Sequence, residues 1–174
     1  MTSESGGDDE GVYMPILVSV DRNTGKINAN VVPSKGVNPY AVKRCGQNLQ
    51  LLGYSRLVLK CDQEPSIMAL RNAVKGDVAI DVVPENNPVG ESQANGEVEG
   101  AIRMVKAQVR TMRLALQSRY NTVIGEDHPI VAWMVAEAAD SINRYQIGAD
   151  GKTCLLYTSP SPRDLSTSRM PSSA

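Results

Sequence analysis

The stretch Arg56–Arg119 organises the sequence, because it joins a strand pattern to a long helix pattern and places a carboxylate in each. It opens with RLVLKCD at residues 56–62, an aliphatic run typical of a strand, so Asp62 is expected where that strand ends. Glu99 lies in a helical pattern whose apolar residues recur at alternating steps of four and three: Val98, Ile102, Val105, Val109, Met112 and Leu116. Two carboxylates on neighbouring elements are candidate ligands for a hard divalent cation.

A second line of residues on the same helix carries positive charge. Steps of four and three from Glu99 reach Arg103, Lys106, Arg110 and Arg113. Such a stripe is usually a solvated helix face, but a face shared with a candidate metal ligand also suits the phosphates of a nucleic acid. Arg103 and Lys106 lie within two turns of Glu99 and are the strongest candidates, Arg110 follows them, and Arg113 is too distant.

Each carboxylate also has a simpler interpretation. Asp62 alone would suit a turn after a strand, and Glu99 alone would suit a surface pair with Arg103 one helical turn away. The intervening Pro84–Gln93 contains two Pro, two Asn and one Gly and is expected to be an irregular loop. Polar side chains around its end, Ser92, Gln93 and Asn95, can hydrogen-bond a DNA end or cap the helix.

Taken together, these residues resemble the second Asp and the Glu of the catalytic core of retroviral and retrotransposon integrases. The segments that carry the resemblance are CDQEPS at 61–66 and VPENNPVGESQANGEVE at 83–99, with PILVSVDRNTG at 15–25, VVPSKG at 31–36, DHP at 127–129, NRY at 143–145 and GKT at 151–153. Between Asp62 and Glu99 lie 36 residues, one more than in the common form of the family. The resemblance covers residues 12–153.

The resemblance implies an α/β fold of the ribonuclease-H-like class, a mixed sheet flanked by helices. It implies DNA end processing and strand transfer with Mg²⁺ or Mn²⁺ held at Asp62 and Glu99. The implied partners are DNA, both element ends and target, and further copies of the chain in a homo-oligomer when the protein is complete. The implied location is the nucleus or a virus-like particle.

The family's first catalytic Asp lies on a strand before the opening hairpin, and that position would precede Met1. Asp21 is not its replacement, since its neighbours match the turn end of the next strand. The chain is therefore expected to be a fragment of a retrotransposon polyprotein that lacks its first, central strand, an enzyme by descent but inactive as written. The alternative is a catalytically dead nucleic-acid-binding or assembly module. A different ribonuclease-H-like nuclease or transposase is disfavoured by residues 90–99.

Composition limits the remaining classes. A chain of 174 residues, 41% hydrophobic and 21% charged, suits one globular domain. The formal net charge of −1 excludes an overall basic nucleic-acid binder, although residues 93–119 hold five Lys or Arg against two Glu. Three scattered cysteines and one histidine argue against a four-ligand zinc site and fit a reducing compartment, with Cys45 and Cys61 buried. No apolar run approaches the ~18 residues of a membrane span, so we expect an intracellular protein with no membrane partner.

The remaining pattern predicts strands alternating with helices after an opening hairpin. The expected strands are Tyr13–Val20, Lys26–Val32, Arg56–Cys61 and Asp77–Val83. The expected helices follow the cap residue Asn38, span Ser66–Lys75, and span Pro129–Tyr145 with His128 as a capping or packing residue and Trp133 in the core.

Three segments are expected. Residues 1–11 are a polar, acidic arm, residues 12–153 are the core, and residues 154–174 are a disordered tail rich in Ser and Pro. The tail resembles the translated read-through of a sequencing adapter, so we assign it no function.

Overall fold

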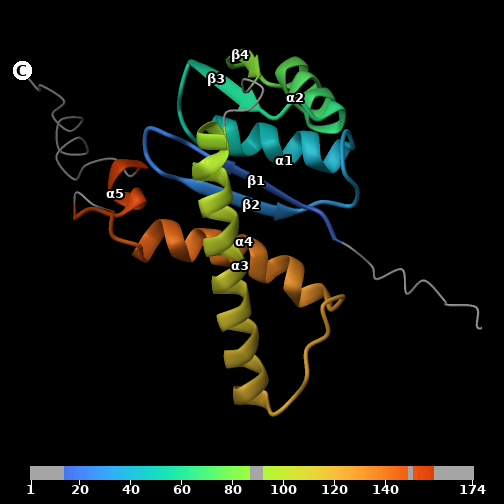
Figure 1. Cartoon of the computed structure of the whole chain (residues 1–174), viewed down its shortest axis with the longest axis vertical. Helices are drawn as coiled ribbons and strands as arrows, with labels where there is room; N and C mark the ends of the chain where they lie inside the picture. The colour runs from blue at the N-terminus through green and yellow to red at the C-terminus, as the bar shows by residue number, and fades with distance from the viewer. Residues whose placement is uncertain (1–13, 87–91, 149–150, 159–174) are drawn as a thin grey trace, which may run out of the picture.

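The computed structural model describes residues 14–86, 92–148 and 151–158, and within them the chain is a mixed α/β fold (Figure 1). This confirms the expected fold class. The elements in chain order are β1 (Ile16–Val20), β2 (Ile27–Val31), α1 (Pro39–Gln50), β3 (Arg56–Cys61), α2 (Pro65–Asp77), β4 (Asp81–Asn86), α3 (Ser92–Tyr120), α4 (Pro129–Tyr145) and α5 (Cys154–Thr158).

β1 and β2 form the expected antiparallel hairpin, with Ile16 opposite Val31 and Val20 opposite Ile27. The turn is closed by Asp21, whose Oδ2 accepts hydrogen bonds from the Thr24 N–H at 3.2 Å and the Thr24 hydroxyl at 2.6 Å. Gly25 follows at φ 72°, a left-handed conformation that glycine adopts without steric cost. Asp21 is therefore a turn residue, as its sequence context predicts.

β3 and β4 form a second, parallel pair, with Arg56 opposite Asp81 and Cys61 opposite Asn86. Among the described residues the two pairs are separate two-stranded sheets, with no ladder between them. β4 also corrects one expectation, because Pro84–Asn86 belong to the strand and not to a loop. Within the described ranges β4 is paired only with β3, and an edge strand tolerates proline because the missing N–H can fall on the unpaired side.

Two helix starts follow the sequence signals. Asn38 caps α1, since its Oδ1 accepts the Ala41 N–H at 2.8 Å and Pro39 occupies the first helical position. His128 caps α4 through Nδ1, which accepts the Ile130 N–H at 3.2 Å. Local sequence therefore fixes both starting points.

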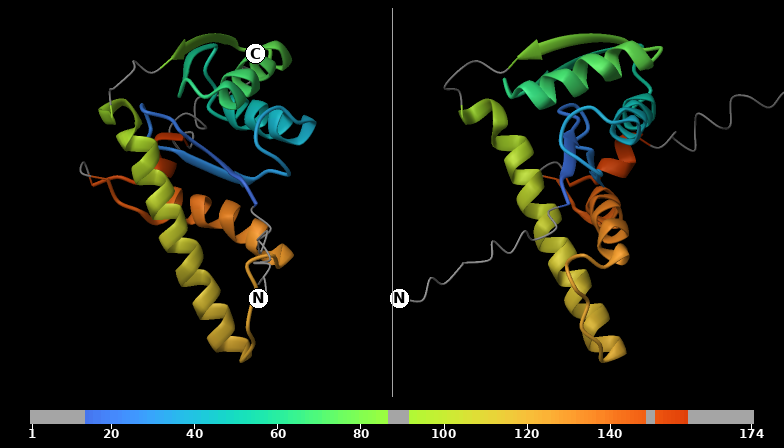
Figure 2. Two further views of the ribbon diagram at one scale, coloured as in Figure 1. Left: turned by 45° about the vertical axis from the view of Figure 1, so that its right-hand side comes forward. Right: turned by 90° about the vertical axis from the view of Figure 1, so that its right-hand side faces the viewer.

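The hairpin is covered on both faces. Figure 2 shows α1 and α3 on opposite sides of it. On the α3 side, β2 packs against α3 and α4 in a cluster whose buried members are Ile27, Ala29, Ala101, Val105, Val135, Ala138 and Ala139. On the α1 side, α1 and α2 bury Val32, Ala41, Leu49, Leu70 and Val74.

The side chain of Asn143 fastens α4 to β2. Its Oδ1 accepts the Ile27 N–H at 2.9 Å, and its Nδ2 donates to the Ile27 carbonyl at 2.7 Å. The residue is buried, so this pair of bonds satisfies backbone groups that water cannot reach.

Trp133 was expected in the core and is instead 57% exposed. The neighbouring Met134 and Val135 are buried, so the face of α4 that packs into the core contains these two residues and not Trp133. The second half of α3 extends beyond the sheets, and there Leu114 and Tyr120 are exposed (Figures 1 and 2).

The expected acidic arm, residues 1–11, lies outside the described residues, as do residues 159–174. Within the expected tail, Cys154–Thr158 form the short helix α5, directly after a bridge between Ile147 and Thr153. None of the described helices is long and apolar enough to cross a membrane.

Candidate nucleic-acid and metal site

A groove of about 660 Å³ opens between the two sheets, lined by β1, β3 and the start of α3. Asp62 reaches it from the end of β3, and Glu99 from the third turn of α3. Both residues are exposed. The structure thus brings the two carboxylates, far apart in the chain, to one groove.

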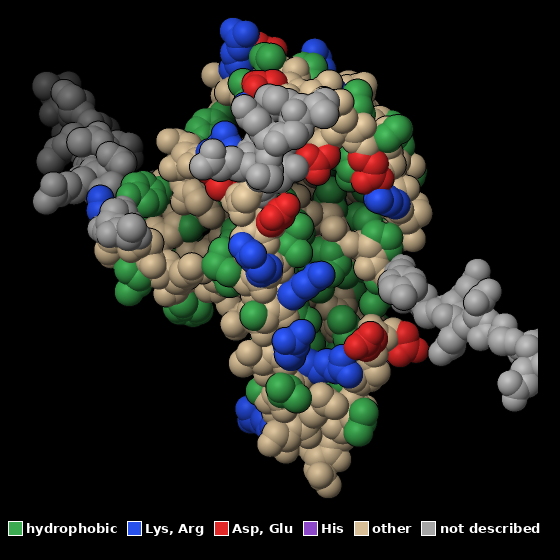
Figure 3. Space-filling model, in the orientation of Figure 1, with side chains coloured by type: hydrophobic (Ala, Val, Ile, Leu, Met, Phe, Trp, Pro, Cys, Tyr) green, Lys and Arg blue, Asp and Glu red, His purple; other side chains and the backbone are tan. Residues whose placement is uncertain are grey.

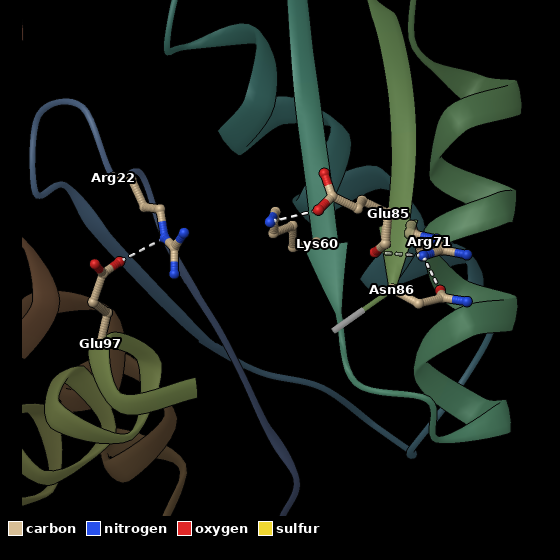
Figure 4. A network of polar contacts seen from close by, with 6 residues as sticks. All are labelled: Arg22, Lys60, Arg71, Glu85, Asn86 and Glu97. Carbon is tan, nitrogen blue, oxygen red and sulfur yellow. Dashed lines mark hydrogen bonds and ion pairs between the residues drawn. The ribbon is translucent and has the colours of Figure 1, made fainter. Parts of the chain in front are cut away.

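Two further carboxylates line the groove and both have partners. Asp21 Oδ2 accepts the Tyr54 hydroxyl at 3.0 Å in addition to its bonds with Thr24. Glu97 pairs with Arg22, Oε2 to Nε, at 2.9 Å and ties the first turns of α3 to the hairpin (Figure 4). Sequence reasoning missed the Arg22–Glu97 pair, because two exposed side chains 75 residues apart leave no local pattern.

The carboxylates of the groove do not by themselves make a complete metal centre. Carboxylate oxygens suit Mg²⁺ or Mn²⁺, but no group of three or more His, Cys, Asp or Glu in the described part of the chain could hold an ion. Asp62 and Glu99 can therefore supply at most a weak, two-residue site.

The cations expected on α3 lie farther along the helix than the residues that line the groove. Arg103, Lys106 and Arg110 are exposed, and Figure 3 shows a row of Lys and Arg side chains over α3. Arg113 is engaged elsewhere, since its Nη1 lies 3.4 Å from Glu126 Oε1. Within the described residues no ion pair joins Glu99 to Arg103, so the surface-pair interpretation of Glu99 gains no support.

Ser92, Gln93 and Asn95 lie in the first turns of α3, but their side chains lie outside the described residues. Their expected contacts with a DNA end stay a prediction.

Beside the carboxyl ends of β3 and β4, α2 carries a buried cation that the sequence did not reveal. Arg71, only 8% exposed, donates from Nη1 to the Glu85 carbonyl at 2.9 Å and to Asn86 Oδ1 at 2.7 Å (Figure 4). Beside it, burial raises the pKa of the half-buried Cys61 thiol, while the Arg71 charge opposes that shift. Lys60 and Glu85, 2.5 Å apart, add a cross-strand ion pair. These contacts hold the ends of β3 and β4 together beside Asp62.

The fold and the groove place the chain in the ribonuclease-H-like class, with the fold of retroviral integrase catalytic cores. The catalytic core of BIV integrase is similar to it, with a TM-score of 0.53 and 25% identity over 82% of this chain and 84% of that one. The HTLV-2 integrase catalytic core, solved with magnesium in a trimeric form, gives a TM-score of 0.55 at 16% identity over 81% and 82% of the two chains.

A chain of the simian T-cell lymphotropic virus intasome in complex with the PP2A regulatory subunit B56 gamma gives a TM-score of 0.61 at 16% identity. The match spans 84% of this chain and 49% of that chain. No protein-family model and no curated protein matches the sequence.

Proposed function

We propose that the chain is an integrase core fragment of a retrotransposon polyprotein that acts in DNA integration by binding DNA along α3 and across the groove. One observation carries the proposal: the groove brings Asp62 and Glu99 together at the head of an exposed row of cations, in a fold of the integrase class. Arg103 and Lys106 contact phosphates closest to the carboxylates, and Arg110 continues the track.

The carboxylates have a separate role in this proposal. Asp62 and Glu99 would hold Mg²⁺ or Mn²⁺ weakly, since two carboxylates leave most of the ion's ligands to solvent or substrate. A divalent ion there would neutralise phosphate charge and lower the pKa of a bound water. The magnesium in the HTLV-2 core supports the choice of cation, and the trimeric form of that core supports an oligomer. A place in the nucleus or a virus-like particle belongs to the same proposal.

A second candidate function is a nucleic-acid-binding or assembly module without catalysis. It is favoured by the hydrogen bonds that Asp21 accepts from Thr24 and Tyr54. The ion pair between Glu97 and Arg22 favours it for the same reason. Because Asp21 and Glu97 are engaged in structural contacts, no further carboxylate in the described part of the groove is left to join Asp62 and Glu99 as a ligand. Both candidates share DNA binding, so the first experiment tests that.

The experiment is a DNA-binding titration across salt concentrations with the double variant Arg103→Glu and Lys106→Glu. Loss of two phosphate contacts should weaken affinity for a short duplex and reduce the salt slope by about one to two units. The matched control is Lys43→Glu with Arg44→Glu, an equal charge change at exposed positions of α1. Unchanged affinity and slope in the α3 variant would show a solvated face. Equal losses in both variants would show an effect of net charge alone.

A further inference from the structure

The ion pair between Arg22 and Glu97 joins two walls of the groove. Arg22 extends from the turn between β1 and β2, and Glu97 belongs to α3, two residues before Glu99. Both side chains line the groove, and Figure 4 shows the guanidinium of Arg22 reaching toward the Glu97 carboxylate. The pair therefore lies beside a candidate metal ligand, on the helix that carries the proposed DNA track.

The backbone that presents Arg22 is held on both sides by one tyrosine. The Tyr54 hydroxyl donates to Asp21 Oδ2 at 3.0 Å, and the same hydroxyl accepts from Asn23 Nδ2 at 3.1 Å. Asp21 Oδ2 also accepts the Thr24 hydroxyl at 2.6 Å. Because the residues before and after Arg22 are fixed in this way, its side chain is presented to the groove from an ordered turn, which reduces the entropy lost when it binds a ligand.

The pair is exposed, so it contributes little to the fold. The Nε–Oε2 distance is 2.9 Å, but the side chains of Arg22 and Glu97 are 52% and 54% exposed. Water screens such a pair, and ordering two long side chains costs entropy. A phosphate can take the place of Glu97, because it carries negative charge and accepts two parallel hydrogen bonds from the planar guanidinium.

The other cations that line the groove are held on the side of β3 and β4. Arg56 pairs with Asp81 of β4 at 3.3 Å, and Lys60 also has its ion-pair partner on β4. Arg71 is buried and donates to the end of the same strand. Arg22 differs from them, because its partner lies on α3. A duplex that follows α3 to the groove therefore meets Arg22 together with its carboxylate.

We propose that Arg22 binds a DNA phosphate at the groove and that Glu97 competes with the duplex for this arginine. The guanidinium would exchange one anionic partner for another, and the Glu97 carboxylate would be released to water. The inference rests on the proposed function, because the phosphate belongs to the duplex that lies along α3. It adds a contact on the hairpin and an acidic residue that lowers the affinity of the free chain for DNA.

Glu97→Gln tests the competition. The substitution keeps the size of the side chain and removes its charge, so affinity for a short duplex should rise about threefold to fivefold, the range that an exposed ion pair can account for. The matched control is Asp140→Asn on α4, which removes one charge from an ion pair with Arg144 at 2.8 Å and similar exposure. Asp140 is outside the groove lining, so affinity should change less than about twofold. Equal gains in both variants would be an effect of net charge and would overturn the proposal.

Arg22→Gln tests the contact itself. Loss of one phosphate contact should weaken affinity about tenfold and reduce the salt slope by about one unit. Combined with Arg22→Gln, Glu97→Gln should give no more gain than Asp140→Asn does. A gain that persists without Arg22 would mean that Glu97 repels DNA directly, and unchanged affinity of Arg22→Gln would mean that Arg22 makes no contact. Either result overturns the proposal, and the gain expected from Glu97→Gln cannot result from a damaged fold.

These results separate the inference from the proposed function, which is tested at Arg103 and Lys106. A loss of affinity there, with none for Arg22→Gln, overturns the inference alone. A loss for Arg22→Gln, with none at Arg103 and Lys106, supports the inference and overturns the track along α3. If neither the unmodified chain nor the Glu97→Gln variant binds the duplex, both are wrong.

Discussion

Asp62 and Glu99 line the same groove, Asp62 directly after β3 and Glu99 in the third turn of α3. Two carboxylates and solvent would bind a divalent ion only weakly, because such ions need more oxygen ligands than two residues supply.

We therefore expect weak, paired metal binding. Mn²⁺ should shift the melting temperature of the unmodified chain, and the double variant Asp62→Asn with Glu99→Gln should abolish the shift. The two substitutions preserve side-chain size, so the metal-free melting temperature should change little, which is the control. An undiminished shift in the double variant would place the ion elsewhere.

Cys45 gives a pH prediction at the same scale. Burial raises the pKa of its thiol from 9.0 to about 11. The folded chain keeps the proton where the unfolded chain loses it, so the stabilisation is fully present below pH 9 and is lost as the pH rises through 11. At about 1.4 kcal/mol per pKa unit, the loss is roughly 2–3 kcal/mol.

The measurement is the free energy of unfolding in urea from pH 8 to 11, compared with Cys45→Ala. The unmodified chain should lose about 2–3 kcal/mol more than the variant over this range. Parallel pH profiles would mean that the thiol titrates normally in the fold.

At the scale of elements, sequence patterns located most strands and helices well. Arg56–Cys61 and Pro129–Tyr145 have the expected bounds, and Asn38 caps the helix that it was expected to cap. Pro84 was wrongly expected in a loop, because the position of a strand at the edge of a sheet is a tertiary property that composition does not show. Trp133 misled because residues 130–136 are apolar throughout, so periodicity could not select the buried face of α4.

The site was predictable in part for the same kind of reason. Asp62, Glu99 and the cation row follow from local patterns and a family resemblance. Arg71 and the Arg22–Glu97 pair depend on contacts between distant segments, which a single sequence does not contain.

Adjacent residues of α4 test the corrected face. Met134→Ala should lower the free energy of unfolding by about 2–5 kcal/mol, because the side chain is fully buried and its removal leaves a cavity. Trp133→Ala should cost far less, since the ring is 57% exposed. Urea unfolding of both variants measures the difference, and a larger loss at Trp133 would restore the original assignment or reveal an interface there.

At the scale of the whole molecule, the described residues form two two-stranded sheets held by helices, with a groove between them. The chain joins the two sheets through α1, and the apolar cluster around α1 and α2 contacts Leu17 of β1 as well as Leu57 and Leu59 of β3. Asp62 and Glu99 line the groove between the two sheets, so their relative position depends on how the two sheets are held together.

From this arrangement we predict that the 174-residue chain alone performs no strand transfer. Holding divalent ions for this reaction would need a further carboxylate, and Asp21 in the groove is already engaged by Thr24 and Tyr54. Incubation with a short duplex and Mg²⁺ or Mn²⁺ should yield no joined product. Turnover that Glu99→Gln abolishes would show that Asp21 or another acidic residue completes the site.

The central claim, that DNA lies along α3 beside the groove, is tested most directly by lysine footprinting. The full chain is acetylated with and without a short duplex, and each lysine is quantified by mass spectrometry. Lys106 on α3 should be protected by DNA, whereas Lys43 on α1 and Lys75 on α2, which are also exposed, should react as before. Protection of Lys43 or Lys75 with Lys106 unchanged would contradict the account.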